Sequence, residues 1–335
     1  MKEFLEQIVA GGSLSREDTR LAFERIMSGQ MDLPVMAGLL VALAVKGETV
    51  DEIVGAAQAM RERVTPVRCD PDTVDTCGTG GDGISTFNVS TAAAIVAAAA
   101  GVPVAKHGNR THTRASGSAE ALEALGVNIE ADVPSVERCL QDAKIGFLYA
   151  RALHPAMRHA APVRTALGIR TLFNLVGPLV NPAGVRRQVV GVSRPSWIDT
   201  IATALRELGA VKAWVVHGCD GLCDLTITGP SHVAELDGGV IRTFEMIPER
   251  CGLSRASLDS LRVGSAAESA EALRHILAGE AGPRRDHALL NAGAAILVGG
   301  RAESLRDGVR LAAEAVDRGA AAATLDLLIE RSHGR

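Results

Sequence analysis

Aromatic residues are scarce in this sequence: six Phe, two Trp and one Tyr make up 3% of 335 residues. Proteins that bind single-stranded nucleic acids stack bases on aromatic side chains, so the composition counts against such a surface. The formal net charge of -4 points the same way, because phosphate backbones are bound by clustered Lys and Arg. We therefore expect no nucleic-acid partner.

Cys-x-x-Cys pairs and long apolar runs are also lacking, and Cys219 and Cys223 are the only close pair of cysteines. No Cys-x-x-Cys occurs among the six cysteines, which favours reduced thiols over a disulfide framework. The first residues contain no apolar core of a secretory signal, and the longest apolar run, residues 92–105, is shorter than the ~20 residues that span a bilayer. The sequence predicts a cytoplasmic protein with no membrane partner.

Residues 1–65 predict helices only. Ser15 and Thr49 each stand three residues before an acid and just ahead of an apolar run, which is the pattern of a helix N-terminal cap. Residues 33–45 are apolar on nearly every side. They indicate a helix that is buried between neighbours or covered by a second subunit.

After residue 66, short β-branched runs alternate with helical stretches. The runs lie at residues 73–77, 102–105, 146–149, 188–192 and 213–216. This alternation predicts an α/β fold with a mostly parallel sheet, whose ligands gather at the carboxyl ends of the strands. Residues 273–331 return to a helical pattern.

Four glycines fall within the six residues 78–83. Their spacing satisfies the Gly-x-Gly-x-x-Gly fingerprint of dinucleotide-binding proteins, but that fingerprint needs a helix opening within the glycines and an acid about 20 residues later. Here residues 85–91 intervene before the helix, and the next acid after Asp82 is Glu120. The chain also has no Gly-Lys-Ser/Thr, which excludes the usual P-loop.

The glycine loop leads instead to Asn88, Ser90 and Thr91 at a helix start. Converging N–H groups of a glycine loop and of a helix N-terminus favour an anion such as phosphate. A second loop begins at Lys106, one of only five Lys against thirty Arg, and a compact ammonium suits phosphate oxygens. For the neighbouring His107, two interpretations stay open: a hydrogen-bonded loop histidine, which is at least as well supported, and a residue with an acid–base role.

Four segments, in this order, closely resemble anthranilate phosphoribosyltransferases. They are residues 75–83, 86–91, 106–110 and 170–179. The resemblance continues to residues 289–295 and covers essentially the whole chain. It implies a small N-terminal helical domain, here 1–68 joined by part of 170–187, and a larger α/β catalytic domain with a mostly parallel sheet at 69–335. A homodimer through the helical part is usual in the family.

The implied reaction belongs to tryptophan biosynthesis. The phosphoribosyl group of 5-phospho-α-D-ribose 1-diphosphate (PRPP) passes to the amine of anthranilate, and pyrophosphate is released. Such a displacement needs mainly positioning and neutralisation of anions, with Mg²⁺ as the expected cofactor. No residue is assigned as a dedicated acid or base.

The resemblance also implies the substrate contacts. The positions for PRPP are Gly78, Gly81, Asp82, Thr86, Asn88, Val89, Ser90, Thr91, Lys106, His107, Gly108, Asn109, Arg110, Thr111, His112, Thr113, Arg114 and Ser118. Those for anthranilate are Gly78, Asn109 and Arg164, with His107, His154 and Met157 lining the pocket. The planar fork of an arginine suits a carboxylate, although a helix arginine paired to an internal acid is the alternative.

The chain departs from the family at its metal site. Where the family has adjacent Asp and Glu, this chain has Cys223 and Asp224, which with Ser90 are the implied magnesium ligands. A thiol is a poor ligand for Mg²⁺, and Asp220 would compensate only if its loop curled toward the site. We expect retained chemistry with weaker magnesium affinity, and loss of a metal site or of activity as the alternative.

Other interpretations stay open. A phosphoribosyltransferase of the same fold that acts on another aromatic amine, or a nucleoside phosphorylase, would share these loops. A non-catalytic homologue with an impaired magnesium site would bind nucleic acid or a partner protein. Cys219 and Cys223 would form a soft-metal site or a redox pair, whereas the i,i+5 spacing of His154 and His159 disfavours zinc.

Overall fold

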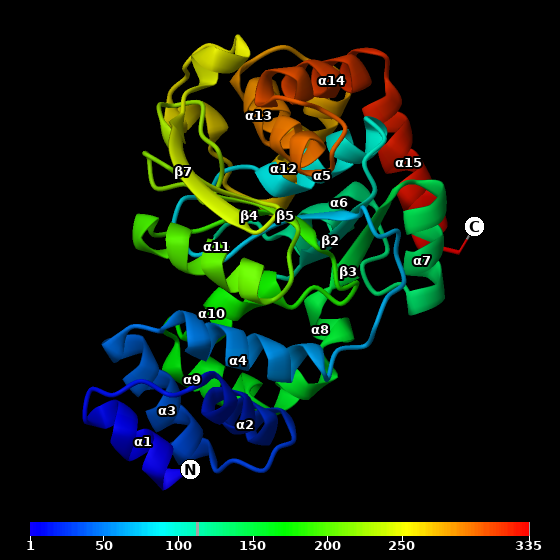
Figure 1. Ribbon diagram of the computed structural model, residues 1–335. Coiled ribbons are helices and arrows are strands. Elements are labelled where there is room, and N and C mark those ends of the chain that lie inside the picture. Colours follow the sequence, from blue (N-terminus) through cyan, green and yellow to red (C-terminus); the bar gives the residue numbers. More distant parts are fainter. Residues whose placement is uncertain (112–113, 335) are drawn as a thin grey trace.

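The computed structural model describes residues 1–111 and 114–334. Its N-terminal part is a helical bundle that lies beside an α/β unit built on one sheet (Figure 1). The helices of the bundle are α1 (Lys2–Val9), α2 (Arg16–Met27), α3 (Leu33–Lys46) and α4 (Val50–Arg61). The predicted caps are confirmed, because the Ser15 and Thr49 side chains accept hydrogen bonds from the backbone three residues on.

Three segments from the middle of the chain complete the bundle. They are η1 (Pro155–His159), α9 (Ala161–Leu167) and α10 (Leu172–Val176), which contact α2, α3 and α4. The Phe173 ring of α10 lies 5.2 Å from that of Phe23 in α2. The segment that joins the bundle therefore begins before the expected residues 170–187.

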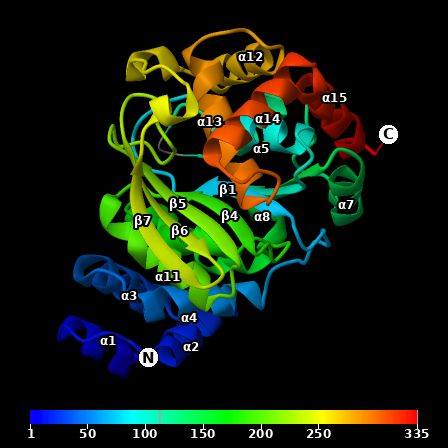
Figure 2. The ribbon, with the colours of Figure 1, turned by 45° about the horizontal axis from the view of Figure 1, so that its top comes forward.

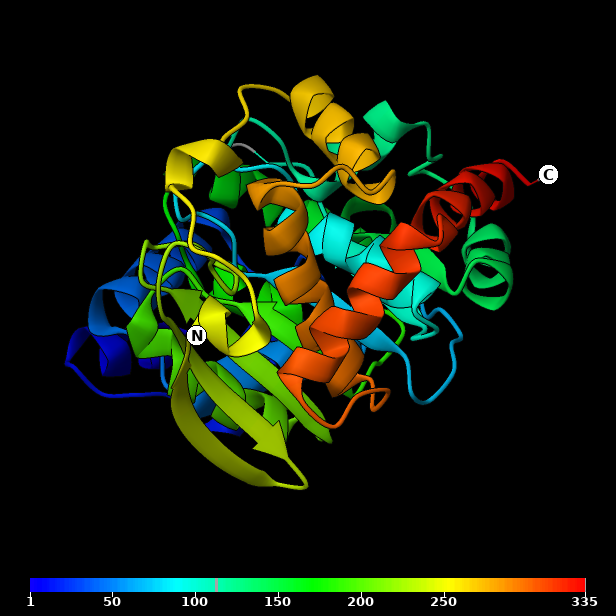
Figure 3. The ribbon, with the colours of Figure 1, turned by 90° about the horizontal axis from the view of Figure 1, so that it is seen from above.

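Seven strands form the sheet. They are β1 (Val74–Gly78), β2 (Val104–Gly108), β3 (Ile145–Tyr149), β4 (Arg187–Gly191), β5 (Lys212–Gly218), β6 (Ser231–Asp237) and β7 (Val240–Met246). Their order is β3-β2-β1-β4-β5-β6-β7. The first five pair in parallel, which confirms the predicted sheet, whereas the antiparallel β6 and β7 were not predicted. This hairpin forms one edge of the sheet (Figure 3).

Helices cover both faces of the sheet (Figure 2). One face packs against α5 (Val89–Ala99), α12 (Ala266–Leu277), α13 (Pro283–Val298), α14 (Leu305–Asp317) and α15 (Ala320–Ser332). The other face packs against α11 (Ile198–Glu207), α10 and the bundle. Successive strand residues are buried on opposite faces, as a covered parallel sheet requires. The remaining helices are α6 (Ser118–Leu125), α7 (Val133–Asp142) and α8 (Ala150–Leu153), with short 3₁₀ turns η2 (Gly177–Leu179), η3 (Pro195–Trp197), η4 (Pro248–Cys251) and η5 (Leu258–Leu261).

Among the described residues, no helix is both long and apolar enough to cross a membrane.

A buried carboxylate ties the helices of the bundle together. Glu52, with no exposed side-chain surface, accepts hydrogen bonds from the Leu14 N–H at 3.0 Å and the Thr49 N–H at 2.8 Å, and pairs with Lys46 at 3.0 Å. We predict that Glu52→Ala lowers the free energy of unfolding by about 3 kcal/mol, because buried donors lose their acceptor.

Urea unfolding measures this loss, with Asp51→Ala as the control. The neighbouring Asp51 makes only an exposed ion pair with Arg16, so its removal should cost less than about 1 kcal/mol. Equal losses in the two variants would contradict the assigned role of Glu52.

Candidate active site

The site lies where four parallel strands end together. In the register of the sheet, Gly78 at the end of β1 pairs with Gly191 at the end of β4. The polar loops that follow β1, β2, β4 and β5 therefore open at one edge, as expected for an open α/β sheet. Three of these loops and the start of α5 carry most of the predicted site residues.

The glycine loop presents unpaired backbone donors. Within the described part of the chain, the N–H groups of Gly80, Gly81, Asp82 and Gly83 have no hydrogen-bond acceptor. Gly80 and Gly81 have φ angles of 63° and 73°, a region that glycine enters without strain. Successive N–H groups in such a turn are able to form a concave anion site, and the phosphate contact of this loop stays a prediction.

An arginine holds the glycine loop from behind. The Arg170 guanidinium donates to the Gly80 carbonyl and to the Ser193 hydroxyl, and it lies over the Trp197 ring at 5.5 Å. A Cβ at Gly81 would collide with this guanidinium, so glycine is needed there. Sequence reasoning assigned no role to Arg170, and only its place inside a recognised segment hinted at one.

The start of α5 is the second group of anion donors. The Ser90 N–H has no acceptor among the described residues, and Lys106 lies directly behind it. The Lys106 side chain is 2% exposed and donates to the Thr76 carbonyl at 2.7 Å and the Ser90 hydroxyl at 3.0 Å. Burial lowers the pKa of this ammonium, and the buried Asp75 opposes that effect. Lys106 is therefore a built-in cation of the site, not a solvated surface residue.

Asn88 is held by two hydroxyls. Its Oδ1 accepts from the Ser116 and Ser269 hydroxyls, each at 2.6 Å, so Asn88 links α5 to the second loop and to α12. Among the other predicted PRPP positions, the Thr86 and Thr91 hydroxyls are buried and have no partner within the described residues.

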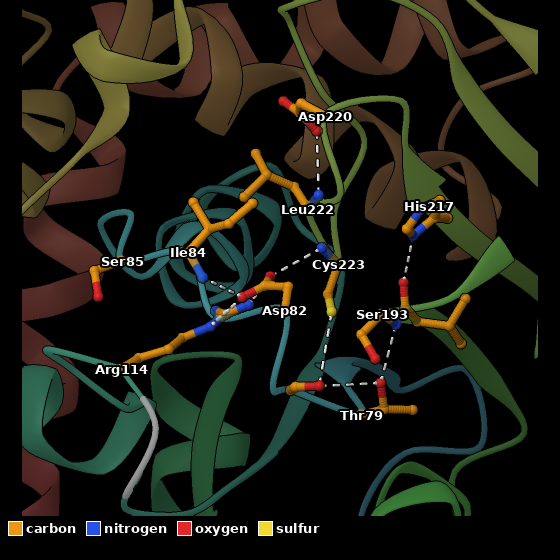
Figure 4. Close-up of polar contacts among 12 residues, drawn as sticks. Thr79, Asp82, Ile84, Ser85, Arg114, Ser193, His217, Asp220, Leu222 and Cys223 are labelled. Carbon is orange, nitrogen blue, oxygen red and sulfur yellow. Dashed lines mark hydrogen bonds and ion pairs between the residues drawn. The ribbon is translucent and has the colours of Figure 1, made fainter.

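The Asp82 carboxylate joins three loops (Figure 4). It accepts from the Arg114 Nε at 2.7 Å and from a second nitrogen of the same guanidinium, and its Oδ2 accepts from the Cys223 N–H at 3.2 Å. The Asp82 side chain has no exposed surface. The glycine loop, the loop after β2 and the segment after β5 therefore share one buried anion.

The loop after β2 is tied to α6. Arg110 pairs with Glu123 at 3.0 Å, and the Thr111 N–H donates to Glu120 at 3.1 Å. The Ser118 hydroxyl donates to the Asn109 carbonyl at 3.4 Å. The predicted contacts of His112 and Thr113 lie outside the described residues.

The two residues at the family's metal position differ in character. Burial raises the pKa of the Cys223 thiol to about 11, so the sulfur is protonated near neutral pH. Burial also raises the pKa of Asp224 to about 7, and this carboxylate makes no hydrogen bond or ion pair within the described chain. Asp224, Cys223 and Ser90 line one small cavity.

Asp220 is engaged elsewhere. Its carboxylate accepts from the Thr226 hydroxyl at 2.6 Å, the Thr228 hydroxyl at 2.9 Å and the Leu222 N–H at 3.1 Å. Figure 4 shows it well apart from Asp82. Asp220 thus closes its own loop, and this arrangement favours a structural role over compensation for Cys223. All six cysteines are free thiols.

The residues predicted to contact the acceptor lie between the sheet and the bundle. Arg164 on α9 stacks over the Phe173 ring at 5.2 Å and has no acidic partner in the described part of the chain. Burial lowers the pKa of this guanidinium. The alternative of an exposed helix arginine paired to a carboxylate is therefore wrong for the described residues, and Arg164 is a half-buried cation.

Two buried imidazoles form the neighbouring wall. The His107 and His154 Nε2 atoms lie 3.1 Å apart, and His107 also bonds the Gly177 carbonyl. Burial lowers the pKa of His107 to about 3 and that of His154 to about 4, so both rings are neutral near pH 7. Met157 packs partly buried against the same core as Phe173.

Within the described residues, no group of three or more His, Cys, Asp or Glu side chains is arranged to hold a metal. In phosphate-binding enzymes, Mg²⁺ is usually held by one or two carboxylates together with oxygen atoms of the substrate.

Comparisons with known proteins agree with this geometry. The helical bundle domain of a glycosyl transferase family matches residues 2–64, and the α/β domain of that family matches residues 70–322. An anthranilate phosphoribosyltransferase from Parvibaculum lavamentivorans is 50% identical over 334 residues, which are 100% of this chain and 98% of the relative.

Solved structures match over the whole length. The anthranilate phosphoribosyltransferase of Thermus thermophilus superposes with a TM-score of 0.93 at 43% identity, covering 98% of this chain and 99% of that one. The Saccharomyces cerevisiae enzyme in complex with PRPP and Mg gives a TM-score of 0.90 at 27% identity, covering 99% and 98%. A complex of the yeast enzyme with 4-fluoroanthranilate gives 0.89 at 26% identity, with the same coverage.

The buried histidine pair predicts a pH-dependent stability. Because the folded pKa of His154, about 4, lies below the unfolded value near 6.5, the unfolded chain binds more protons between these values, and stability falls as the pH falls. At pH 5, His154 should lower the free energy of unfolding by about 2 kcal/mol relative to pH 7. In His154→Gln, the free energy of unfolding should therefore decrease less between pH 7 and pH 5.

Urea unfolding at pH 7 and pH 5 measures the difference, with His159→Gln, a half-buried histidine at the end of η1, as the control. An unchanged pH dependence in His154→Gln would contradict a neutral buried imidazole.

Proposed function

The chain belongs to the anthranilate phosphoribosyltransferases, and we propose that it transfers the phosphoribosyl group of PRPP to the amine of anthranilate in tryptophan biosynthesis, releasing pyrophosphate. The observation that carries the proposal is that a loop with free N–H groups occurs together with an arginine that has no acidic partner among the described residues. The glycine loop offers free N–H groups for a diphosphate, and Arg164 offers a cation for a carboxylate.

We assign PRPP to the loops after β1 and β2 and to the start of α5. The contacts proposed are those implied by the resemblance, from Gly78 to Ser118. Support comes from the free N–H groups of residues 80–83 and of Ser90, with Lys106 behind them. For anthranilate, the proposed contacts are Gly78, Asn109 and Arg164, beside the His107 and His154 wall.

The reaction breaks the bond between ribose C1 and the diphosphate oxygen and forms a bond between C1 and the amine nitrogen, which then loses a proton. Negative charge grows on the departing diphosphate, so preorganised N–H donors and the buried Lys106 stabilise the transition state. Arg164 orients the acceptor by its carboxylate. The aromatic amine is already a neutral nucleophile, and we assign no dedicated acid or base.

The donors at the family's metal position fit Mg²⁺ in part. The Asp224 carboxylate makes no hydrogen bond or ion pair among the described residues, and together with the Ser90 hydroxyl it supplies the hard oxygen atoms that Mg²⁺ prefers. The Cys223 thiol does not fit. When bound, Mg²⁺ supplies charge neutralisation at the leaving diphosphate. We propose Asp224 and Ser90 as its protein ligands.

We further propose a cytoplasmic homodimer that associates through the bundle. Large apolar side chains at the bundle surface support this arrangement: Val9 is 72% exposed, Leu33 49% and Val45 83%. All three residues stand on or next to α1 and α3, two helices of the bundle that contact each other.

The test of the proposed function is pyrophosphate release from PRPP, with and without anthranilate, across a magnesium titration. Release that depends on anthranilate is the expected result. No release, with calorimetric binding of PRPP retained, would instead favour another amine acceptor or a non-catalytic role.

Arg164→Ala should raise the KM for anthranilate by about 10- to 100-fold, because a charged hydrogen bond to the carboxylate is lost. The KM for PRPP should change little. Steady-state kinetics measure both constants, and Arg158→Ala removes a nearby exposed arginine as the control. Equal effects on the two substrates would remove the role assigned to Arg164.

Cys223→Asp should lower the magnesium concentration for half-maximal activity by roughly tenfold, because a carboxylate replaces a neutral thiol near Asp224. The control Cys223→Ala removes the thiol without adding a charge or an oxygen ligand and should leave the midpoint unchanged. No shift in Cys223→Asp would mean that position 223 does not act on the metal in this protein.

A further inference from the structure

Two polar side chains interrupt the buried apolar stretch of helix α13. His287 is 0% exposed and Asn291 is 4% exposed, and they stand four residues apart, on one face of the helix. Buried polar groups are retained only where they are hydrogen-bonded, so their partners indicate what they do.

Both side chains bind the backbone of a single residue, Leu225. Its N–H donates to the Asn291 Oδ1 at 3.0 Å, and its carbonyl accepts from the Asn291 Nδ2 at 2.9 Å. The His287 Nε2 donates to the same carbonyl at 2.8 Å. The other ring nitrogen of His287 is buried without a partner in the described part of the chain, consistent with a neutral imidazole.

Leu225 directly follows Asp224, the carboxylate proposed to hold magnesium. Asp224 makes no hydrogen bond or ion pair among the described residues, so the position of its backbone is a main constraint on where the carboxylate lies, beside the charges of Arg114 and Lys106. That backbone is confined on the opposite side as well, since a Cβ at Gly191 would lie 1.6 Å from the Cys223 carbonyl oxygen. The segment from Cys223 to Leu225 is therefore held between β4 and α13.

Asn291 also borders the place where the metal would lie. The small cavity lined by Ser90, Cys223 and Asp224 has Asn291 in its wall. The amide reaches this cavity while it is hydrogen-bonded to Leu225 and to the His287 carbonyl, which its Nδ2 also contacts at 3.0 Å. Both N–H donors of the amide are used, and its Oδ1 accepts from the Leu225 N–H, so the side chain is held by backbone groups on both sides and is suited to positioning.

We propose that Asn291, assisted by His287, is a positioning residue that fixes the Asp224 carboxylate for the magnesium–diphosphate complex. This inference rests on the proposed function. With Cys223 at the neighbouring position, one carboxylate must supply the protein's anionic contact to the metal, so an error in its placement is not compensated by a second acid. Partners that orient metal ligands typically change affinity by 10- to 100-fold when removed.

The experiment measures PRPP binding by calorimetry at a series of Mg²⁺ concentrations, in parallel with steady-state kinetics. In Asn291→Ala the magnesium midpoint for PRPP binding should rise by about tenfold, while the KM for anthranilate stays within about twofold. His287→Leu removes one of two donors to the Leu225 carbonyl and should shift the midpoint in the same direction by about threefold. The His287→Leu variant still tests the proposal if Asn291→Ala does not fold.

Asn128→Ala is the matched control. The Asn128 amide donates to the Ser332 carbonyl at 3.2 Å, far from the site. The variant should therefore lower the unfolding temperature without moving the magnesium midpoint. An unchanged midpoint in the folded Asn291 and His287 variants would overturn the positioning role. The proposed function fails separately, if the wild-type protein releases no pyrophosphate in the presence of anthranilate.

Discussion

The site depends on the parallel pairing of β1 between β2 and β4. Because these strands run in one direction and end in register, loops that are distant in sequence open at the same edge of the sheet. The Asp82 carboxylate then connects them through Arg114 and the Cys223 backbone. A shift of one strand would separate the diphosphate donors from the carboxylate proposed for the metal.

The charge balance of the site follows from this packing. Backbone N–H groups, Lys106 and Arg164 supply positive potential, and the acidic groups are few and buried. Such a site is incomplete without its substrate, since PRPP brings the negative charge that these donors are arranged to receive. The protonated Cys223 thiol adds no negative charge to the site. A magnesium ion at the proposed position would therefore depend more on oxygen atoms of the substrate.

The sequence predicted those features that follow local rules. The five parallel strands, the caps at Ser15 and Thr49 and the glycine turn with its free N–H groups follow from patterns a few residues long. The hairpin of β6 and β7 was missed, although Asp237-Gly238-Gly239 carries a turn signal between its strands. What local patterns could not predict are partners chosen by tertiary packing: the contact of Asn291 with Leu225, 66 residues away, and that of Arg170 with Gly80, 90 residues away.

The helical bundle has a consequence for synthesis on the ribosome. Its core is completed by Leu172 and Phe173 of α10, which pack with α2 and α4 although more than 100 residues separate them in the chain. At roughly 5–20 residues per second, the nascent bundle waits several seconds with part of its apolar face uncovered. During that interval, Arg164 and His154, the residues proposed to lie beside anthranilate, have not yet taken their places. The core of the helical bundle is therefore complete only after translation has passed the middle of the gene.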